Sequence, residues 1–419
     1  MKKLLPIVLV AVLCLTLAVG VFAACDSTQP LVGLIALHDE KSTYDKNFID
    51  AFKAACEAKG LTDKQYKIVT NVPEDEKCYN FAADLADAGC KAIFADSFGH
   101  EAHILKAAKE FKDVQFCHAT GTNAVLETNK DVANYHNAFA SIYEARYLAG
   151  VAAGMKLQEM ISGNKLTEKN IDENGNYLIG YVGAYTYAEV ISGYTSFYLG
   201  VKSVVENVTM QVTFTGSWYD LADEKAAAEK LIGNGCALVS QHADSMGAPT
   251  ACENAKVPNI TYNISTATQC IDTYVIASRI NWQPYFEMMI DNVLTGKELP
   301  KDWTGTIKTG SVEIMEIGKA AAEGTQAKLD QVKAGILDGS VKVFDTSKFT
   351  VTVVSEGKNQ KNVGAVVDEA GHVTSYKIKA DGVNEADAIG NGQFNESTLR
   401  SAPYFDLQID GIVLLDTVY

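Results

Sequence analysis

The chain lacks the short motifs that mark many nucleotide-using and metal-using enzymes. It has no GxxxxGK[ST] phosphate loop, no GxGxxG after Val32-Gly33, and no CxxC pair. The fragment ADSFG at residues 95–99 resembles a nucleophile elbow but lacks the first glycine of GxSxG. His100 and His103 are spaced as HExH and not as HExxH, so we interpret them as solvated residues at a helix start. The sequence therefore predicts no catalytic residue, no metal site and no cofactor.

Basic residues are scarce. The chain has 36 Lys and Arg against 52 Asp and Glu, which gives a net charge of −16. Loss of Lys2 and Lys3 with an N-terminal segment would bring this charge to about −18. A surface of this sign repels nucleic acid and anionic lipid headgroups, so neither is expected to bind through charge.

Long apolar runs are also rare, and the chain has one. It occupies residues 4–24 behind two lysines, as in a signal peptide spanning 1–24. The sequence Ala23-Ala24-Cys25-Asp26 is similar to a bacterial lipobox, which predicts cleavage before Cys25 and lipidation of its thiol. Ordinary signal peptidase cleavage and an uncleaved anchor are the alternatives, since the run approaches the roughly 20 residues that span a bilayer. We expect an exported bacterial protein, held on the outer face of the cell membrane by lipid.

Obvious cysteine pairs are absent. Beyond Cys25 an odd number remains, namely Cys56, Cys78, Cys90, Cys117, Cys236, Cys252 and Cys270. In an exported protein these residues could form disulfides and leave one free thiol. Because some of them lie within apolar runs, we favour mostly buried thiols that act as small core residues.

What the chain does contain is an internal repeat. Gly33 in a first apolar run corresponds to Gly180 in a second, and Cys90 corresponds to Cys236 at nearly the same offset. Each passage alternates short apolar runs with segments of helical period, which is typical of a parallel sheet covered by helices. The sequence predicts an α/β fold with two Rossmann-like lobes, followed by a β-rich C-terminal extension.

Aromatic and polar side chains follow the predicted strands. Trp218 and Asp244 come just after two strands of the second lobe, where open α/β sheets bind ligands. A flat aromatic face beside a carboxyl acceptor suits a planar ligand that carries N–H groups. Asp244 could equally cap a helix beginning near Met246. The other candidate ligand contacts are Tyr44, Phe98, Tyr185, Asn281 and Trp282.

Several longer blocks resemble the basic membrane protein (Med-like) family of substrate-binding lipoproteins that serve ABC importers. They are DSFGHEAHILKAAKEFKDVQFCHATG, NYHNAFASIYEARYLAGVAAG, GYVGAYTYAEVISGYTSFYLGVKSV, GSWYD with QHADS, and INWQPYF. The resemblance implies a type I periplasmic-binding-protein fold, with two lobes joined by three crossing strands that close on a purine base or nucleoside. It also implies an ABC permease as partner. By position, Trp218 would stack on an adenine-like base, Asp244 would bond its edge, and Phe98 and Trp282 would complete the pocket.

The expected division assigns 31–136 with 268–300 to lobe 1 and 137–267 with 301–345 to lobe 2. Residues 346–419 form the extension, which lies beyond what the resemblance covers. The leading hypothesis is a non-catalytic solute receptor of an importer. A surface sensor or regulatory partner with the same fold and no transport role is the alternative, and an exported nucleoside-cleaving enzyme is the third.

Overall fold

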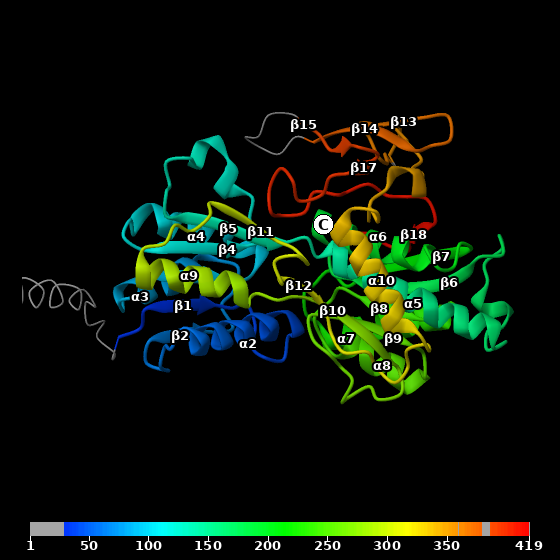
Figure 1. Ribbon diagram of the computed structural model, residues 1–419, viewed down its shortest axis with the longest axis horizontal. Helices are drawn as coiled ribbons and strands as arrows, with labels where there is room; N and C mark the ends of the chain where they lie inside the picture. Colours follow the sequence, from blue (N-terminus) through cyan, green and yellow to red (C-terminus); the bar gives the residue numbers. More distant parts are fainter. Residues whose placement is uncertain (1–28, 359, 379–385, 419) are drawn as a thin grey trace, which may run out of the picture.

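The computed structural model describes residues 29–358, 360–378 and 386–418. The expected signal peptide and Cys25 lie outside these ranges. Two α/β lobes lie side by side, and the chain crosses between them more than once (Figure 1). The predicted α/β class with two lobes is confirmed.

Lobe 1 is built on six parallel strands in the order β11-β5-β4-β3-β1-β2. Leu34 and Phe94 face one core and their neighbours Ile35 and Ile93 face another, so the sheet is apolar on both sides. Helices α2 (Thr43–Ala58) and α9 (Gln283–Thr295) cover the first face, and α3 (Glu76–Asp87) and α4 (Glu101–Glu110) cover the second. The strands are β1 (Val32–Ile35), β2 (Tyr66–Val69), β3 (Ala92–Ala95), β4 (Gln115–Ala119), β5 (Tyr135–Ala140) and β11 (Asp302–Gly305).

Lobe 2 has seven strands in the order β12-β10-β9-β8-β6-β7-β18, of which only β12 is antiparallel to its neighbour. Helices α5 (Tyr143–Ser162) and α6 (Ala188–Lys202) cover one face, α7 (Leu221–Gly233) and α8 (Gly247–Ala255) the other, and α10 (Thr325–Asp338) packs on α5. The strands are β6 (Tyr177–Gly183), β7 (Val208–Phe214), β8 (Val239–Gln241), β9 (Asn259–Tyr262), β10 (Tyr274–Ile280), β12 (Val312–Ile314) and β18 (Ile412–Leu414).

The internal repeat is present in three dimensions. A Cβ on Gly33 would lie 3.0 Å from Leu85 and 3.6 Å from the Cys90 sulfur. A Cβ on Gly180 would lie 3.0 Å from Leu231 and 3.3 Å from the Cys236 sulfur. Each lobe therefore has an equivalent glycine in its first strand, and the missing side chain leaves room for a leucine and a cysteine thiol. All seven cysteines of the described chain are free and buried, which confirms the expectation of core thiols.

The lobe boundaries differ from those expected. The chain crosses after β5, after β10 and after β11, because β10 pairs with β9 in lobe 2 while β11 pairs with β5 in lobe 1. Residues 137–140 and 302–305 thus belong to lobe 1, and 274–280 belong to lobe 2. The expected boundaries divided β5 after residue 136 and placed β10 and β11 in the wrong lobes, because an apolar run does not reveal which neighbour its strand pairs with.

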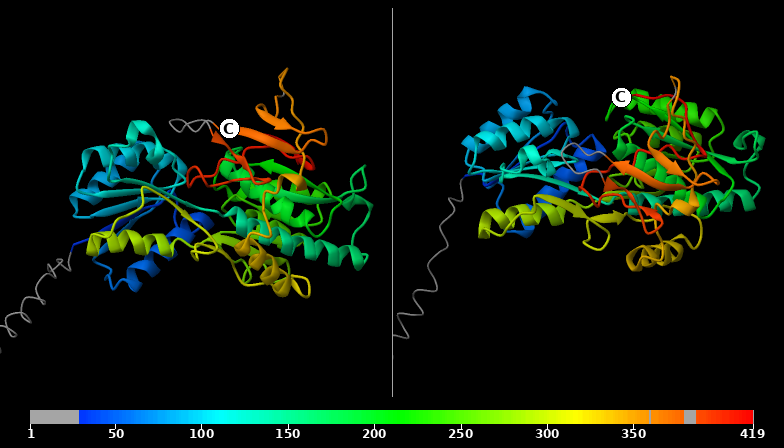
Figure 2. Two further views of the ribbon diagram at one scale, coloured as in Figure 1. Left: turned by 45° about the horizontal axis from the view of Figure 1, so that its top comes forward. Right: turned by 90° about the horizontal axis from the view of Figure 1, so that it is seen from above.

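The C-terminal extension lies mainly over lobe 2 (Figure 2). Its regular structure is short strands, as expected, apart from one short 3-10 turn (Thr346–Lys348): β13 (Ala365–Val367), β14 (Val373–Ile378), β15 (Ala386–Asp387), β16 (Ile389–Gly390), β17 (Gln393–Phe394) and finally β18. The last strand does not stay in the extension but joins the lobe 2 sheet beside β7. A bond from Ser401 N to Asp302 Oδ2 at 2.8 Å also ties the extension to lobe 1.

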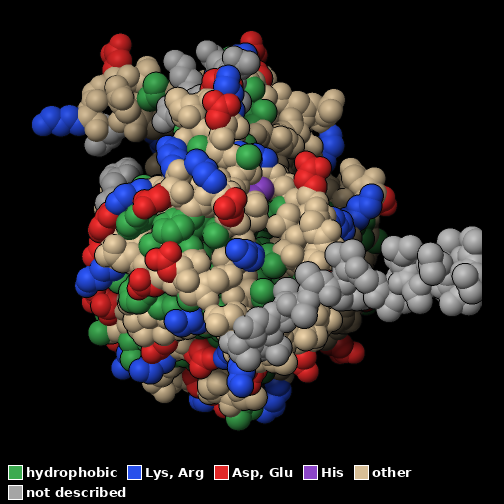
Figure 3. All heavy atoms as spheres, turned by 90° about the vertical axis from the view of Figure 1, so that its left-hand side faces the viewer, with side chains coloured by type: hydrophobic (Ala, Val, Ile, Leu, Met, Phe, Trp, Pro, Cys, Tyr) green, Lys and Arg blue, Asp and Glu red, His purple; other side chains and the backbone are tan. Residues whose placement is uncertain are grey.

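On the end of the molecule formed by lobe 1, acidic and basic side chains are interspersed (Figure 3). No continuous basic patch is visible on that face. Within the described ranges, no helix combines the length and the apolarity needed to cross a bilayer.

Candidate functional site

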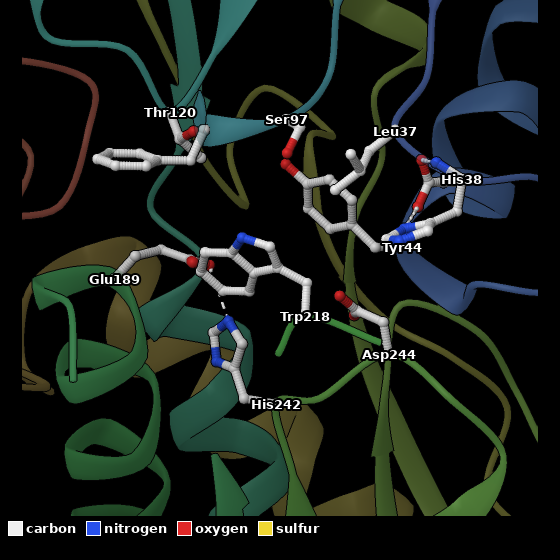
Figure 4. A pocket seen from close by; sticks show the side chains of 11 residues that line it. Leu37, His38, Tyr44, Ser97, Thr120, Glu189, Trp218, His242 and Asp244 are labelled. Atoms are coloured by element: carbon white, nitrogen blue, oxygen red, sulfur yellow. Dashed lines mark hydrogen bonds and ion pairs between the residues drawn. The ribbon is translucent and has the colours of Figure 1, made fainter. Parts of the chain in front are cut away.

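A pocket lies between the lobes, at the carboxyl ends of β1, β3, β4, β7 and β8 (Figure 4). The empty space within it, its open mouth included, is about 380 Å³. Lobe 1 contributes Leu37, His38, Tyr44, Asp45, Ser97, Phe98 and Thr120, and lobe 2 contributes Glu189, Trp218, His242 and Asp244.

The lobe 1 wall is fixed by the start of α2. The Tyr44 hydroxyl donates to the carbonyl of Asp96 over 2.8 Å, which holds the ring against the end of β3. Asp45 accepts from the His38 amide at 2.7 Å and from the Ser42 hydroxyl at 2.6 Å. Burial opposes ionisation of Asp45, but hydrogen bonds from His38 and Ser42 together lower its pKa. This carboxylate is therefore a charged acceptor in the wall.

The lobe 2 wall is a cluster of aromatic rings on two loops. Trp218 follows β7, and its ring centroid lies 5.0 Å from that of Tyr185 and 6.0 Å from that of Tyr187. The Asp244 amide donates to the Trp218 carbonyl over 3.0 Å, so the loops after β7 and β8 hold each other. The indole is fixed by these neighbours and lies at the centre of the pocket in Figure 4.

Asp244 is 4% exposed and directs its carboxyl group toward the space between Trp218 and Tyr44 (Figure 4). Its Oδ1 accepts from Asn263 Nδ2 at 3.0 Å. Burial raises the pKa of Asp244 well above its ordinary value, and the carboxylates of Glu224, Asp45 and Glu189 add to the shift. The helix-capping alternative is not observed, because the amide of Gly247, the first residue of α8, donates to Ser245 Oγ and not to Asp244.

On the lobe 2 side of the pocket, His242 lies between Arg146 and Glu189. Its Nδ1 lies 3.1 Å from Nη2 of Arg146, and its Nε2 lies 3.2 Å from Oε1 of Glu189. Because a guanidinium can only donate, Nδ1 must be the acceptor and Nε2 must carry the proton. Burial lowers the pKa of His242, which keeps the ring neutral in this tautomer, with Nε2 next to Glu189.

The helices that carry this network approach closely. A Cβ on Gly150 of α5 would lie 2.1 Å from the Phe197 carbonyl oxygen, and one on Gly200 of α6 would lie 2.2 Å from the Tyr147 carbonyl oxygen. Only glycine permits this separation. The contact brings Arg146, near the start of α5, against the histidine that pairs with Glu189, near the start of α6.

The lobes touch directly around the pocket. The Thr43 amide of lobe 1 donates to the Asp244 carbonyl of lobe 2 over 2.8 Å, and Asn47 Nδ2 donates to the Ile280 carbonyl over 2.8 Å. At the mouth, Phe98 stacks on Tyr187 with ring centroids 5.3 Å apart. The arrangement is a closed one.

Four of the predicted contacts, Tyr44, Phe98, Trp218 and Asp244, meet in this pocket. Tyr185 supports Trp218 from behind and is not in the lining.

The two remaining contacts were placed wrongly. Trp282 is 1% exposed and stacks on Phe48 with centroids 4.4 Å apart, because it begins α9 and this helix packs against α2. Asn281 Nδ2 bonds to the Gly310 carbonyl at 3.1 Å, beside a crossing between the lobes.

Sequence reasoning missed His38, Asp45, Glu189 and His242. His242 stands in the QHADS block and Asp45 in the loop after the first strand, so the sequence carries a signal for both. Glu189 has no comparable signal, because an acid at the start of a helix is expected for capping reasons alone.

The motifs set aside as non-catalytic are structural. His100 is fully buried and bonds through Nε2 to the Val72 carbonyl at 2.9 Å, so the expectation of a solvated residue was wrong. Ser97 Oγ donates to Glu74 Oε1 at 2.5 Å and not to a histidine. The described residues contain no group of three or more acidic, histidine or cysteine side chains able to hold a metal ion.

His100 makes stability depend on pH. Burial lowers its pKa to about 4, whereas the unfolded chain takes up this proton near its ordinary pKa of about 6.5. The stability that it contributes is therefore lost as the pH falls from about 6.5 toward 4. Between pH 7 and pH 4.5 we expect the free energy of unfolding to fall by about 2 kcal/mol more in the wild type than in His100→Gln.

Urea denaturation at the two pH values measures this difference. His103→Gln is the matched control, since solvent reaches its ring and 23% of the side chain is exposed. Equal losses in the wild type and His100→Gln would contradict the prediction.

A family model described as ABC transporter substrate-binding protein PnrA-like matches residues 34–347. The chain belongs to this family. It is thus a PnrA-like substrate-binding protein of an ABC transporter, which implies a small-molecule ligand and a permease partner. The resemblance to basic membrane proteins is confirmed, and the family consists of solute-binding proteins and not of enzymes.

Among relatives of this PnrA-like protein, a purine-binding protein of Brucella abortus (strain 2308) is 30% identical over 297 residues, which are 69% of this chain and 78% of that protein. A protein of Haloferax volcanii named as a putative ABC transporter glucose-binding protein is 27% identical over 264 residues, covering 63% of this chain and 61% of its own. A solved solute-binding protein of an ABC transporter system from Aeropyrum pernix K1 has a TM-score of 0.61 at 14% identity. It covers 75% of this chain and 93% of that one, and supports the fold alone.

Proposed function

We propose that this protein captures an adenine-like purine base between its lobes and delivers it to an ABC permease. The observation that carries the proposal is the pairing of Trp218 with Asp244, an indole face held next to a buried carboxyl group that points into the pocket. Base-on-aromatic stacking is worth about 1–3 kcal/mol, and the carboxyl group would accept N–H groups at the base edge.

The charges of the lining support a donor-rich ligand without negative charge. Asp45, Glu189 and Asp244 face the pocket, and none of the eleven lining residues is Lys or Arg. Arg146 is fully buried beneath, where it bonds His242 and the Gln241 carbonyl. A phosphate group would meet carboxylates with no cation to compensate, so purine nucleotides are expected to be rejected.

The two relatives suggest different ligands. The name of the Brucella protein specifies purines and that of the Haloferax protein specifies glucose. We favour a purine because stacking on a single central indole and N–H recognition by several carboxyl groups suit a flat heterocycle. The remaining parts of the proposal are export, cleavage before Cys25 and lipid anchoring on the outer face of the cell membrane.

Isothermal titration with four probes tests the ligand class. We expect adenine to bind, AMP and glucose not to bind, and adenosine to show whether ribose is tolerated. Mass spectrometry of small molecules released from the denatured, freshly purified protein gives an independent result. Binding of glucose without adenine would overturn the purine assignment and leave the solute-binding role intact.

A further inference from the structure

We propose that the end of the C-terminal extension is a positioning element of the ligand pocket. The segment concerned, residues 412–418, is called the clasp. The structure assigns to it the task of holding both loops that carry the aromatic wall. This inference rests on the proposed function only for the choice of adenine as probe. The family match ends at residue 347, so it does not include the clasp.

The clasp begins as a strand in the lobe 2 sheet. β18 runs parallel to β7, with Ile412 beside Met210 and Leu414 beside Val212. The Leu415 amide continues the pairing by donating to the Val212 carbonyl over 2.8 Å. Because β7 leads directly into the loop that carries Trp218, this register sets where the clasp meets that loop.

Asp416 accepts hydrogen bonds from the last two residues of β7. Its Oδ1 accepts from the Phe214 amide at 2.7 Å, and its Oδ2 accepts from the Thr213 hydroxyl at 2.6 Å. Lys230 of α7 places its Nζ 3.2 Å from the same Oδ2. One side chain thus joins the clasp, the last residues of β7 and the helix that follows the Trp218 loop.

Val418 connects the clasp to the second loop. Its carbonyl accepts from the Thr186 amide at 2.8 Å and also from the Thr186 hydroxyl. Thr186 stands between Tyr185 and Tyr187, the two rings that contact Trp218. The Val418 side chain also lies against Gly216, where an added Cβ would approach it to 3.1 Å.

The clasp therefore bonds through Asp416 to the end of β7, where the Trp218 loop begins, and through Val418 to the loop that carries Tyr185 and Tyr187. Of the rings between these anchors, Trp218 lines the pocket, Tyr185 and Tyr187 pack against it, and Tyr187 also stacks on Phe98 at the mouth. Without the clasp, both loops would keep their chain connections but lose these lateral bonds. The geometry points to an effect on ligand affinity that exceeds any effect on overall folding.

The test compares Asp416→Ala with Asp368→Ala. Asp368 is the matched control because it also accepts two backbone amides, from Ala370 and His372, but does so in the turn between β13 and β14. We expect Asp416→Ala to bind adenine about 5- to 10-fold more weakly and Asp368→Ala to bind as the wild type. Asp416→Asn, which can still accept from the Phe214 amide, should recover most of the affinity.

Hydrogen exchange supplies a readout that needs no ligand. The Thr186 amide should exchange faster in Asp416→Ala than in the wild type, with thermal melting of the whole protein nearly unchanged. If Asp416→Ala does not fold, a chain ending at Asp416, which lacks the Val418 carbonyl, replaces it in both measurements.

Unchanged adenine affinity together with unchanged exchange at Thr186 would overturn the inference. If the wild type does not bind adenine, the choice of ligand fails, and the exchange at Thr186 then decides the role of the clasp.

Discussion

Trp218→Ala should weaken adenine binding by about 100-fold while the protein stays folded. The indole supplies the stacking face, and loss of base stacking costs about 1–3 kcal/mol. Removal of the ring also withdraws the surface against which Tyr185 and Tyr187 pack, so the wall around the empty space becomes less ordered. Isothermal titration with adenine measures the affinity, and circular dichroism with thermal melting establishes that the fold is retained.

Two further variants make this result specific to stacking. Trp218→Phe keeps a smaller flat ring and should lose about 10-fold or less. Tyr219→Ala removes the neighbouring aromatic residue, which contacts His38 and is not part of the lining, and should bind nearly as the wild type. An unchanged affinity in Trp218→Ala would remove the central observation on which the purine proposal stands.

Asp244→Asn should produce the other large loss, of about 10- to 100-fold in adenine affinity. At a pH where Asp244 is ionised, hydrogen bonds to its charged carboxylate are worth about 1.5–3 kcal/mol, and the amide of Asn places an N–H₂ group where the ligand needs an acceptor. Asn263 can still donate to the remaining oxygen, so the loop after β8 should keep its shape.

The pH dependence of adenine binding tests whether the ionised carboxylate of Asp244 is the binding form. Burial raises the pKa of Asp244 in the free protein, so the ionised form that accepts N–H groups becomes populated as the pH rises through this raised value. The affinity of the wild type for adenine should therefore increase with pH, and the affinity of Asp244→Asn should not. Titrations at several pH values measure both slopes, and parallel slopes would contradict the assignment.

Much of the fold could be predicted because helices, strands and the internal repeat depend on residues close together in the sequence. Gly33 with Cys90 and Gly180 with Cys236 indicate the duplicated lobes from the sequence alone, and the two pairs pack alike in the structure. Strand pairing is not local. No pattern within residues 274–280 or 302–305 shows which of two sheets will take the strand, and the lobe boundaries were wrong for this reason.

The site divides in the same way. Trp218 and Asp244 could be predicted because ligands of open α/β sheets bind just past the carboxyl ends of the strands. Trp282 also follows a strand, but it does not reach the pocket. The helix that follows it packs on lobe 1, and the ring is buried there against Phe48. The contacts among Arg146, His242 and Glu189 depend on the close approach of two helices, which a single sequence does not reveal.

The seven buried thiols bear on how the chain can be unfolded and refolded. With every described cysteine free, no covalent cross-link closes a loop in the described ranges, although the chain crosses between the lobes three times. The described polypeptide has no disulfide bond, so non-covalent contacts alone hold its fold. A chain of this kind can unfold to pass a narrow channel without reduction of disulfides, and its refolding does not wait for their oxidation.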